Sequence, residues 1–332
     1  MLKNSLTAGV ARIDITPPLG FRMAGAMRRT EGATGIESPL LATALVLADD
    51  LLKIVIISCD LIGLDPPLAN EIRDQIGKRL SISSSNVVLG CTHTHNGPCT
   101  SRGNIGGVHD IGGEAWEIEA LDVYIGDLVS QLVDLATTAD QERQPARASG
   151  GEGTARVSIN REEIDSKGKT FVGQNPDGLT DHSVPVLRVD DLEGGPIAVI
   201  TGYACHPVSM GYETYEFTPD FPGVVRRVVE RVTGATCLYL TGAAGNQASL
   251  SFLQSDWGEM ERMGGQIGAA AVQEFYRIDT RPHKIVREEG KSLSDVAHYT
   301  KEFSTGSTHQ NFSIETRQVT VPLQQLPDLE TA

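Results

Sequence analysis

The chain has 332 residues with 40% hydrophobic and 21% charged residues, the composition of an ordinary globular protein. Its 43 acidic and 28 basic side chains give a formal net charge of −15, which argues against nucleic acid or an anionic membrane surface as a partner. No apolar stretch has the length of a signal peptide or a transmembrane segment, so we expect a soluble, cytoplasmic protein unless a leader was removed.

Short β-branched runs alternate with segments of helical periodicity along the chain. We predict strands over residues 43–49, 53–58, 86–91, 185–189, 197–203 and 236–242. We predict helices over residues 68–80, 116–138, 223–232 and 260–276. The alternation predicts an α/β fold, with layers formed by a mixed, largely parallel central sheet flanked by helices. We expect residues 1–332 to form a single domain.

Four segments fall outside this alternation. Residues 17–39 and 101–114 are rich in glycine, so we expect surface loops near a site. Residues 278–311 are polar and are expected to be irregular. Residues 312–323 are predicted to form a last strand, and because the sequence stops soon afterwards we expect the domain to be incomplete at its C-terminus.

The strongest local signal is the string CTHTHNGP, residues 91–98, which directly follows a predicted strand. On an extended backbone, His93 and His95 project to the same side, so both imidazoles reach one ion or one substrate. The alternative is a pair of histidines hydrogen-bonded in a tight turn, because Asn96-Gly97-Pro98 is also typical of turns.

Three further candidates also follow predicted strands. His206 precedes a proline that favours an extended backbone, and Asp60 stands at the end of the strand predicted over 53–58. Gly242–Asn246 offers small residues whose N–H groups can approach an oxyanion. Their alternatives are a structural hydrogen bond, a cap and close packing, respectively. Because ligands bind at the carboxyl ends of strands in open α/β sheets, we expect these residues to converge on one cleft.

Seven strings, taken in order, resemble the N-terminal catalytic domain of the neutral/alkaline non-lysosomal ceramidase family: AGVARIDITPPLG, ISCDLIGL, CTHTHNGP, SINREE, YACHPVSMG, TPDFPG and LTGAAGNQ. The resemblance runs from about Gly9 to Gln247. It implies a zinc amidohydrolase that splits the N-acyl bond of ceramide. By position it implies that His93 and His206 bind Zn²⁺, that His95 lies beside the metal, and that Arg161 faces the substrate.

Two departures from the family concern the same site. Gly245 stands where the family carries a serine proposed to be catalytic, and the family's glutamate and tyrosine zinc ligands lie downstream of this sequence. Because catalytic zinc sites usually have three protein ligands, Asp60, His95 and Asp220 are candidates for the third. Asp220 is equally suited to cap the helix predicted to begin near Gly223.

The resulting hypothesis is hydrolysis of an amide-like bond by a metal-activated water. His95 acts as general acid or base, while Arg161 and the N–H groups around Gly245 and Asn246 stabilise the oxyanion. We expect a small-molecule amide or a lipid-like substrate. The aromatic content of 5% and the glycine-rich loops favour a substrate smaller or more polar than ceramide. The sequence assigns no oligomeric state.

Two alternatives remain open at this point. A thiol hydrolase would use Cys91 or Cys205 beside the histidines. However, the five cysteines are odd in number and mostly lie in apolar runs, which indicates reduced, packed thiols. A catalytically inactive binding protein is the other alternative, because the family's serine and downstream ligands are missing.

Overall fold

A computed structural model describes residues 6–26, 29–101, 114–293, 296–303, 313–317 and 319–320. The larger strands in these ranges are β1 (Thr7–Asp14), β3 (Leu41–Ala48), β4 (Lys53–Cys59), β5 (Val87–Cys91), β6 (Gln144–Thr154), β7 (Ser158–Ile164), β8 (Thr170–Asn175), β9 (Ser183–Asp191), β10 (Pro196–Tyr203), β12 (Thr236–Thr241), β14 (His283–Leu293) and β15 (Val296–Phe303). The short strands are β2 (Gly35–Ile36), β11 (Glu216–Phe217) and β13 (Gln247–Ser249). The α-helices are α1 (Pro66–Leu80), α2 (Ala115–Gln141), α3 (Phe221–Thr233) and α4 (Trp257–Arg277).

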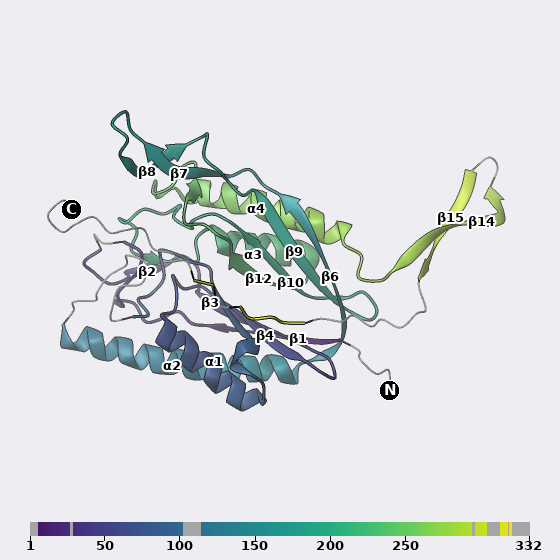
Figure 1. The fold of residues 1–332 in the computed structure, drawn as a ribbon, viewed down its shortest axis with the longest axis horizontal. Helices are drawn as coiled ribbons and strands as arrows, with labels where there is room; N and C mark the ends of the chain where they lie inside the picture. The colour runs from purple at the N-terminus through teal and green to yellow at the C-terminus, as the bar shows by residue number, and fades with distance from the viewer. Residues whose placement is uncertain are drawn as a thin grey trace.

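Eight strands form one sheet in the order β12-β10-β9-β6-β1-β3-β4-β5. The sheet folds over, so that β12 at one edge lies against β3, β4 and β5 of the other half (Figure 1). The hydrogen bonds that join the halves include those from Ser58 Oγ to the Tyr239 carbonyl at 2.5 Å and from Thr241 Oγ1 to the Thr92 carbonyl at 2.6 Å. The carboxyl ends of β5 and β12 therefore lie close together.

The helices cover the two outer faces of the folded sheet and make four layers. Helices α1 and α2 pack on the half that contains β1, β3, β4 and β5, whereas α3 and α4 pack on the other half (Figure 1). Three apolar clusters fill the spaces between these layers. The central one includes Leu45 and Leu47 from one half, with Val189, Ala198 and Leu238 from the other. Burial of this apolar surface is what holds the halves together.

Local sequence accounts for where the helices begin. Helix α1 follows Asp65, whose side chain accepts a hydrogen bond from the Leu68 N–H at 3.0 Å, and two prolines occupy its first positions. Helix α2 begins with a capping box formed by Glu114 and Glu117. Within the described residues, no helix is both long and apolar enough to cross a membrane.

The predicted α/β fold with a mixed sheet is confirmed, but parallel pairing is less extensive than expected. It is confined to the pairs β4–β5 and β10–β12, and the other neighbours in the sheet are antiparallel. The cause is the length of the connections. Residues 49–52 and 192–195 join β3 to β4 and β9 to β10, and such short links form hairpins, because parallel strands need a crossover of a dozen residues or more.

Two predictions near the C-terminal end are wrong in the described residues. The segment 278–311, expected to be irregular, contains the hairpin β14–β15, which projects from the body (Figure 1). Most described side chains of β15 are exposed, so its sequence lacks the alternation that marks a half-buried strand. Residues 313–317 and 319–320 are in no strand, and the rest of the predicted strand 312–323 lies outside the described residues. Most of the loop predicted at 101–114 does so as well.

Candidate metal centre

The three candidate histidines come from the two halves of the folded sheet. His93 and His95 follow β5, and His206 follows β10, which pairs in parallel with β12. In the sequence His93 and His206 are 113 positions apart, yet their Nε2 atoms lie 3.1 Å from each other. The fold therefore brings together the two segments on which the metal hypothesis depends.

Each of the three rings is fixed by a backbone carbonyl. The Nδ1 atom of His93 lies 2.7 Å from the Ile62 oxygen, that of His95 lies 2.8 Å from the Gly25 oxygen, and that of His206 lies 2.7 Å from the Ala244 oxygen. Since a carbonyl only accepts, each Nδ1 carries the proton and each Nε2 is left with its lone pair. Such carbonyls orient metal-binding histidines in proteins generally.

The three imidazole rings are in contact, with ring centroids 4.7 to 5.4 Å apart. One ligand atom from each histidine lies within 4.8 Å of the others. His95 Nε2 is buried and has no hydrogen-bond partner among the described residues. Lone pairs at such separations repel one another unless a proton or a cation lies between them. Three imidazole nitrogens are a donor set that suits Zn²⁺, in which ligating nitrogens lie about 2.0–2.1 Å from the ion, so these residues fit the metal.

Burial favours the neutral form of these histidines. Desolvation lowers the pKa of His95 to about 3 and that of His206 to about 4, and it also lowers the pKa of His93. A neutral imidazole is the form that binds a metal. For His95, a pKa this far below neutrality suits a ligand better than a general base, whose pKa is best near the working pH.

The sequence predicts an extended backbone at His93, and this prediction is wrong. Its φ angle is 63°, in the left-handed region, and its N–H donates to the Leu61 carbonyl at 2.9 Å. The strand β5 ends at Cys91, so the alternation of side chains no longer applies two residues later. His93 and His95 meet because the chain turns here, with His93 anchored to the Ile62 carbonyl and His95 to the Gly25 carbonyl.

Arg161 lies beside the histidines on β7, which pairs with β13. Its charge contributes to the lowered pKa of both His93 and His206, and its own pKa is lowered by burial. The Arg161 Nε donates to the Gly245 carbonyl at 2.9 Å, and its backbone N–H donates to the Asn246 carbonyl at 2.8 Å. Gly245 and Asn246 thus hold Arg161 in place through their carbonyls.

Neither carboxylate predicted as an additional ligand belongs to the histidine group. Asp60 is fully buried, and both of its oxygens bond to Arg226, each at 2.6 Å. Asp220 caps α3 and accepts the N–H groups of Ser209 and Met210 at 3.0 and 3.3 Å. Both acids are engaged in structural bonds, which favours the structural alternatives over their prediction as ligands. Sequence reasoning missed Arg226, since nothing in its helical context distinguishes it from a surface arginine.

The cysteines do not offer a nucleophile. All five are free, and burial raises the pKa of Cys91 to about 12 and that of Cys205 well above its ordinary value. A thiol with such a pKa stays protonated near neutrality, and the protonated form is a poor nucleophile. The geometry therefore gives no support to a thiol hydrolase.

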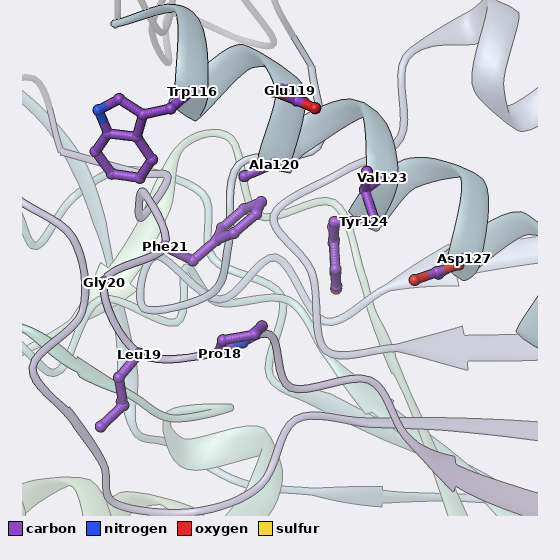
Figure 2. A pocket seen from close by; sticks show the side chains of 10 residues that line it. All are labelled: Pro18, Leu19, Gly20, Phe21, Trp116, Glu119, Ala120, Val123, Tyr124 and Asp127. Atoms are coloured by element: carbon purple, nitrogen blue, oxygen red, sulfur yellow. The ribbon is translucent and has the colours of Figure 1, made fainter.

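An apolar groove of about 690 Å³ lies between the segment 18–21 and the exposed side of α2 (Figure 2). Phe21 and Tyr124 line it with ring centroids 5.1 Å apart, and Trp116 and Val123 contribute further apolar surface. None of the three histidines lines the groove. The loop that contains Phe21 continues to Gly25, whose carbonyl accepts the His95 ring N–H.

Known proteins are similar to this chain in sequence and in fold. A model of the N-terminal part of neutral/alkaline non-lysosomal ceramidase matches residues 6–261. A solved structure of a ceramidase complexed with C2 is similar with a TM-score of 0.66 and 21% identity, over 82% of this chain and 44% of the other. The neutral ceramidase from Pseudomonas aeruginosa gives a TM-score of 0.65 and 21% identity, over 83% of this chain and 45% of the other. The chain thus spans less than half the length of these proteins. The match over residues 6–261 confirms the resemblance: the chain belongs to the neutral/alkaline non-lysosomal ceramidase family.

Proposed function

We propose that the chain is a zinc-dependent hydrolase that cleaves an amide, or N-acyl, bond. The observation that carries the proposal is the convergence of three imidazole Nε2 atoms whose Nδ1 atoms are all held by backbone carbonyls. Family membership supports the class of reaction. We further propose that residues 1–332 form one N-terminal catalytic domain and that the chain shares the ceramidase activity for which its solved relatives are named.

In this proposal His93 and His206 bind the ion. Zinc bound there would supply a Lewis acid that polarises a carbonyl and lowers the pKa of water to about 7. Arg161, held by the Gly245 carbonyl beside the histidines, brings a positive charge toward the oxygen on which negative charge develops. Two roles are open to His95: its free Nε2 can complete the donor set, or it can take a proton from the attacking group.

The groove bears on the class of substrate. Its aromatic and aliphatic lining, part of it from the glycine-rich loop 17–39, provides apolar surface, so we propose that a lipid-like amide places its alkyl part there. The segment from Phe21 to Gly25 spans at most about 14 Å when extended, which puts the groove within reach of a long alkyl chain whose amide lies at the histidines.

Metal analysis of purified variants tests the assignment. We expect one zinc per chain in the unmodified protein and none in His93→Ala or His206→Ala, with hydrolysis lost in both. His298→Ala is the matched control, because His298 lies exposed on the projecting hairpin and should keep both zinc and activity. Full zinc content in His206→Ala would contradict the proposal. Little metal and no hydrolysis after zinc is added to the unmodified chain would favour an inactive binding protein.

The fate of His95→Ala separates its two roles. Loss of zinc identifies a ligand, whereas retained zinc with a large fall in turnover identifies a proton carrier.

A panel of N-acyl sphingosines, short N-acyl amines and simple esters, assayed with added zinc, then defines the substrate class. Activity that survives a strong chelator but is lost in iodoacetamide would restore the thiol mechanism.

A further inference from the structure

Arg29 is a buried arginine next to the histidine centre. Only 7% of its surface is exposed. Its guanidinium donates to four backbone carbonyls: Nη1 to Ala24 at 3.0 Å and to His95, Nη2 to Gly211 at 3.2 Å, and Nε to Tyr212 at 3.3 Å. No carboxylate among the described residues forms an ion pair with it. Burying a charge that has no bonded carboxylate in the described part of the chain is costly, so the bonds to these carbonyls indicate a specific role.

The four carbonyls belong to three segments that meet at the site. Ala24 lies in the loop that precedes Arg29, and His95 lies in the turn after β5. Gly211 and Tyr212 lie in the segment that follows His206. One side chain therefore ties together the turn that presents His95, the segment downstream of His206, and the loop that packs against both.

His95 is held from two sides by the same loop. Arg29 binds its carbonyl, and the Gly25 carbonyl accepts its ring N–H at 2.8 Å. Contact at Gly25 is so close that a side-chain carbon there would lie 2.6 Å from the His95 Cβ, and the φ angle of Gly25 is +93°. His95 Nε2, which has no partner among the described residues, takes its direction from these contacts.

We propose that Arg29 is a positioning residue that holds His95 so that its Nε2 joins those of His93 and His206. The expected consequence is a change in the metal affinity of the site, and in this respect the inference rests on the proposed function. A planar guanidinium has five N–H donors directed to different sides, which lets one residue bind carbonyls in three segments. A lysine ammonium carries its three donors on one atom and cannot cover the same set.

The test compares Arg29→Lys with Arg22→Lys. Arg22 lies in the same loop, and its side chain donates to Glu117 at 2.7 Å and to the Thr30 carbonyl at 2.6 Å. Its backbone carbonyl accepts the Cys99 N–H, which the exchange for lysine leaves in place, and among the described residues its guanidinium has no bond to His95 or to the segment after His206. Because supporting residues around a metal site typically change its affinity by about 10- to 100-fold, we expect Arg29→Lys to weaken zinc binding by that factor. Arg22→Lys should stay within about twofold of the unmodified protein.

A second readout needs neither zinc nor activity. In the metal-free protein labelled with ¹⁵N-histidine, the His95 Nδ1–H proton should give a slowly exchanging signal, identified by its loss in His95→Ala. We expect this signal to broaden or vanish in Arg29→Lys and to persist in Arg22→Lys. If both the signal and the zinc affinity are unchanged in Arg29→Lys, the inference is overturned.

The two readouts also separate this inference from the proposed function. Should the unmodified chain bind no zinc, the proposed function fails, while the proton signal still decides whether Arg29 holds His95. Should Arg29→Lys fail to fold, Arg29→Ala refolded with methylguanidinium replaces it. Recovery of the His95 signal with the added guanidinium supports the role, and folding without recovery of the signal refutes it.

Discussion

The variant Asp60→Asn tests whether the Asp60 carboxylate has a structural role or binds the metal. The Asp60 side chain is 0% exposed and that of Arg226 is 7% exposed, and two bonds of 2.6 Å join them. Asparagine keeps the shape but removes the negative charge, so the buried Arg226 loses the carboxylate to which it is bonded. Breaking a buried pair in this way costs about 3–5 kcal/mol.

This free energy converts into a measurable fall in Tm. At about 2.1 cal/mol/K per residue, the unfolding entropy of 332 residues is about 0.7 kcal/mol/K, so Tm should fall by about 4–7 °C. Zinc content should stay at one per chain. Calorimetry and metal analysis of the same preparation provide the assay, and the double variant Asp60→Leu with Arg226→Met should recover most of the loss. A variant that loses its zinc while Tm changes by less than about 1 °C would show that Asp60 is a ligand and that this reasoning is wrong.

Three further predictions follow from the site and the groove. The pKa values of His95 and His206, lowered to about 3 and about 4, mean that the unfolded chain binds protons that the folded chain does not, so the stability of the metal-free protein should fall as pH drops from about 6.5 to about 4. Each histidine contributes up to about 1.36 kcal/mol to the free energy of unfolding per pH unit. Urea titrations at a series of pH values should therefore show a smaller change in the free energy of unfolding with pH for His206→Asn than for the unmodified chain. Gly245→Ser should change the free energy of unfolding by less than about 1 kcal/mol, because a Cβ at this position meets nothing within 4 Å. The matched control Gly202→Ser should destabilise the protein severely, because its Cβ would lie 2.1 Å from the Leu240 carbonyl oxygen. If the family's serine assists the reaction, Gly245→Ser also raises turnover, and an unchanged rate counts against that role. Finally, Phe21→Ala should raise KM for long-chain N-acyl substrates and leave short-chain ones unaffected; equal effects on both would remove the groove from the substrate site.

Much of the fold was predictable because apolar runs carry the signal of burial. All four predicted helices and six of the seven predicted strands are present, and α3 begins at Phe221 because Asp220 caps it. Strand direction was harder to infer, since it depends on connections such as residues 49–52. There the Asp49 side chain accepts the N–H groups of Leu51 and Leu52 and closes a hairpin.

The site was predictable to the extent that it rests on side chains at strand ends. His93, His95 and His206 could be selected because imidazoles are scarce and follow apolar runs. The atoms that orient them could not be, because the carbonyls of Ile62, Gly25 and Ala244 are backbone groups that any residue would offer. The role of Arg29 could not be inferred for the same reason: its four acceptors are backbone carbonyls, so no charge pattern in the sequence pairs with it.

If His93 and His206 bind zinc as proposed, their origin in opposite halves of the folded sheet would link zinc supply to the amount of folded protein. An ion shared by residues 113 positions apart is bound only when both halves are assembled, because the unfolded chain offers no such arrangement. At a zinc concentration 100 times the dissociation constant, this linkage adds about 2.7 kcal/mol to stability. A cell starved of zinc would then lose this protein to proteolysis as well as lose its activity, so its abundance should follow zinc availability.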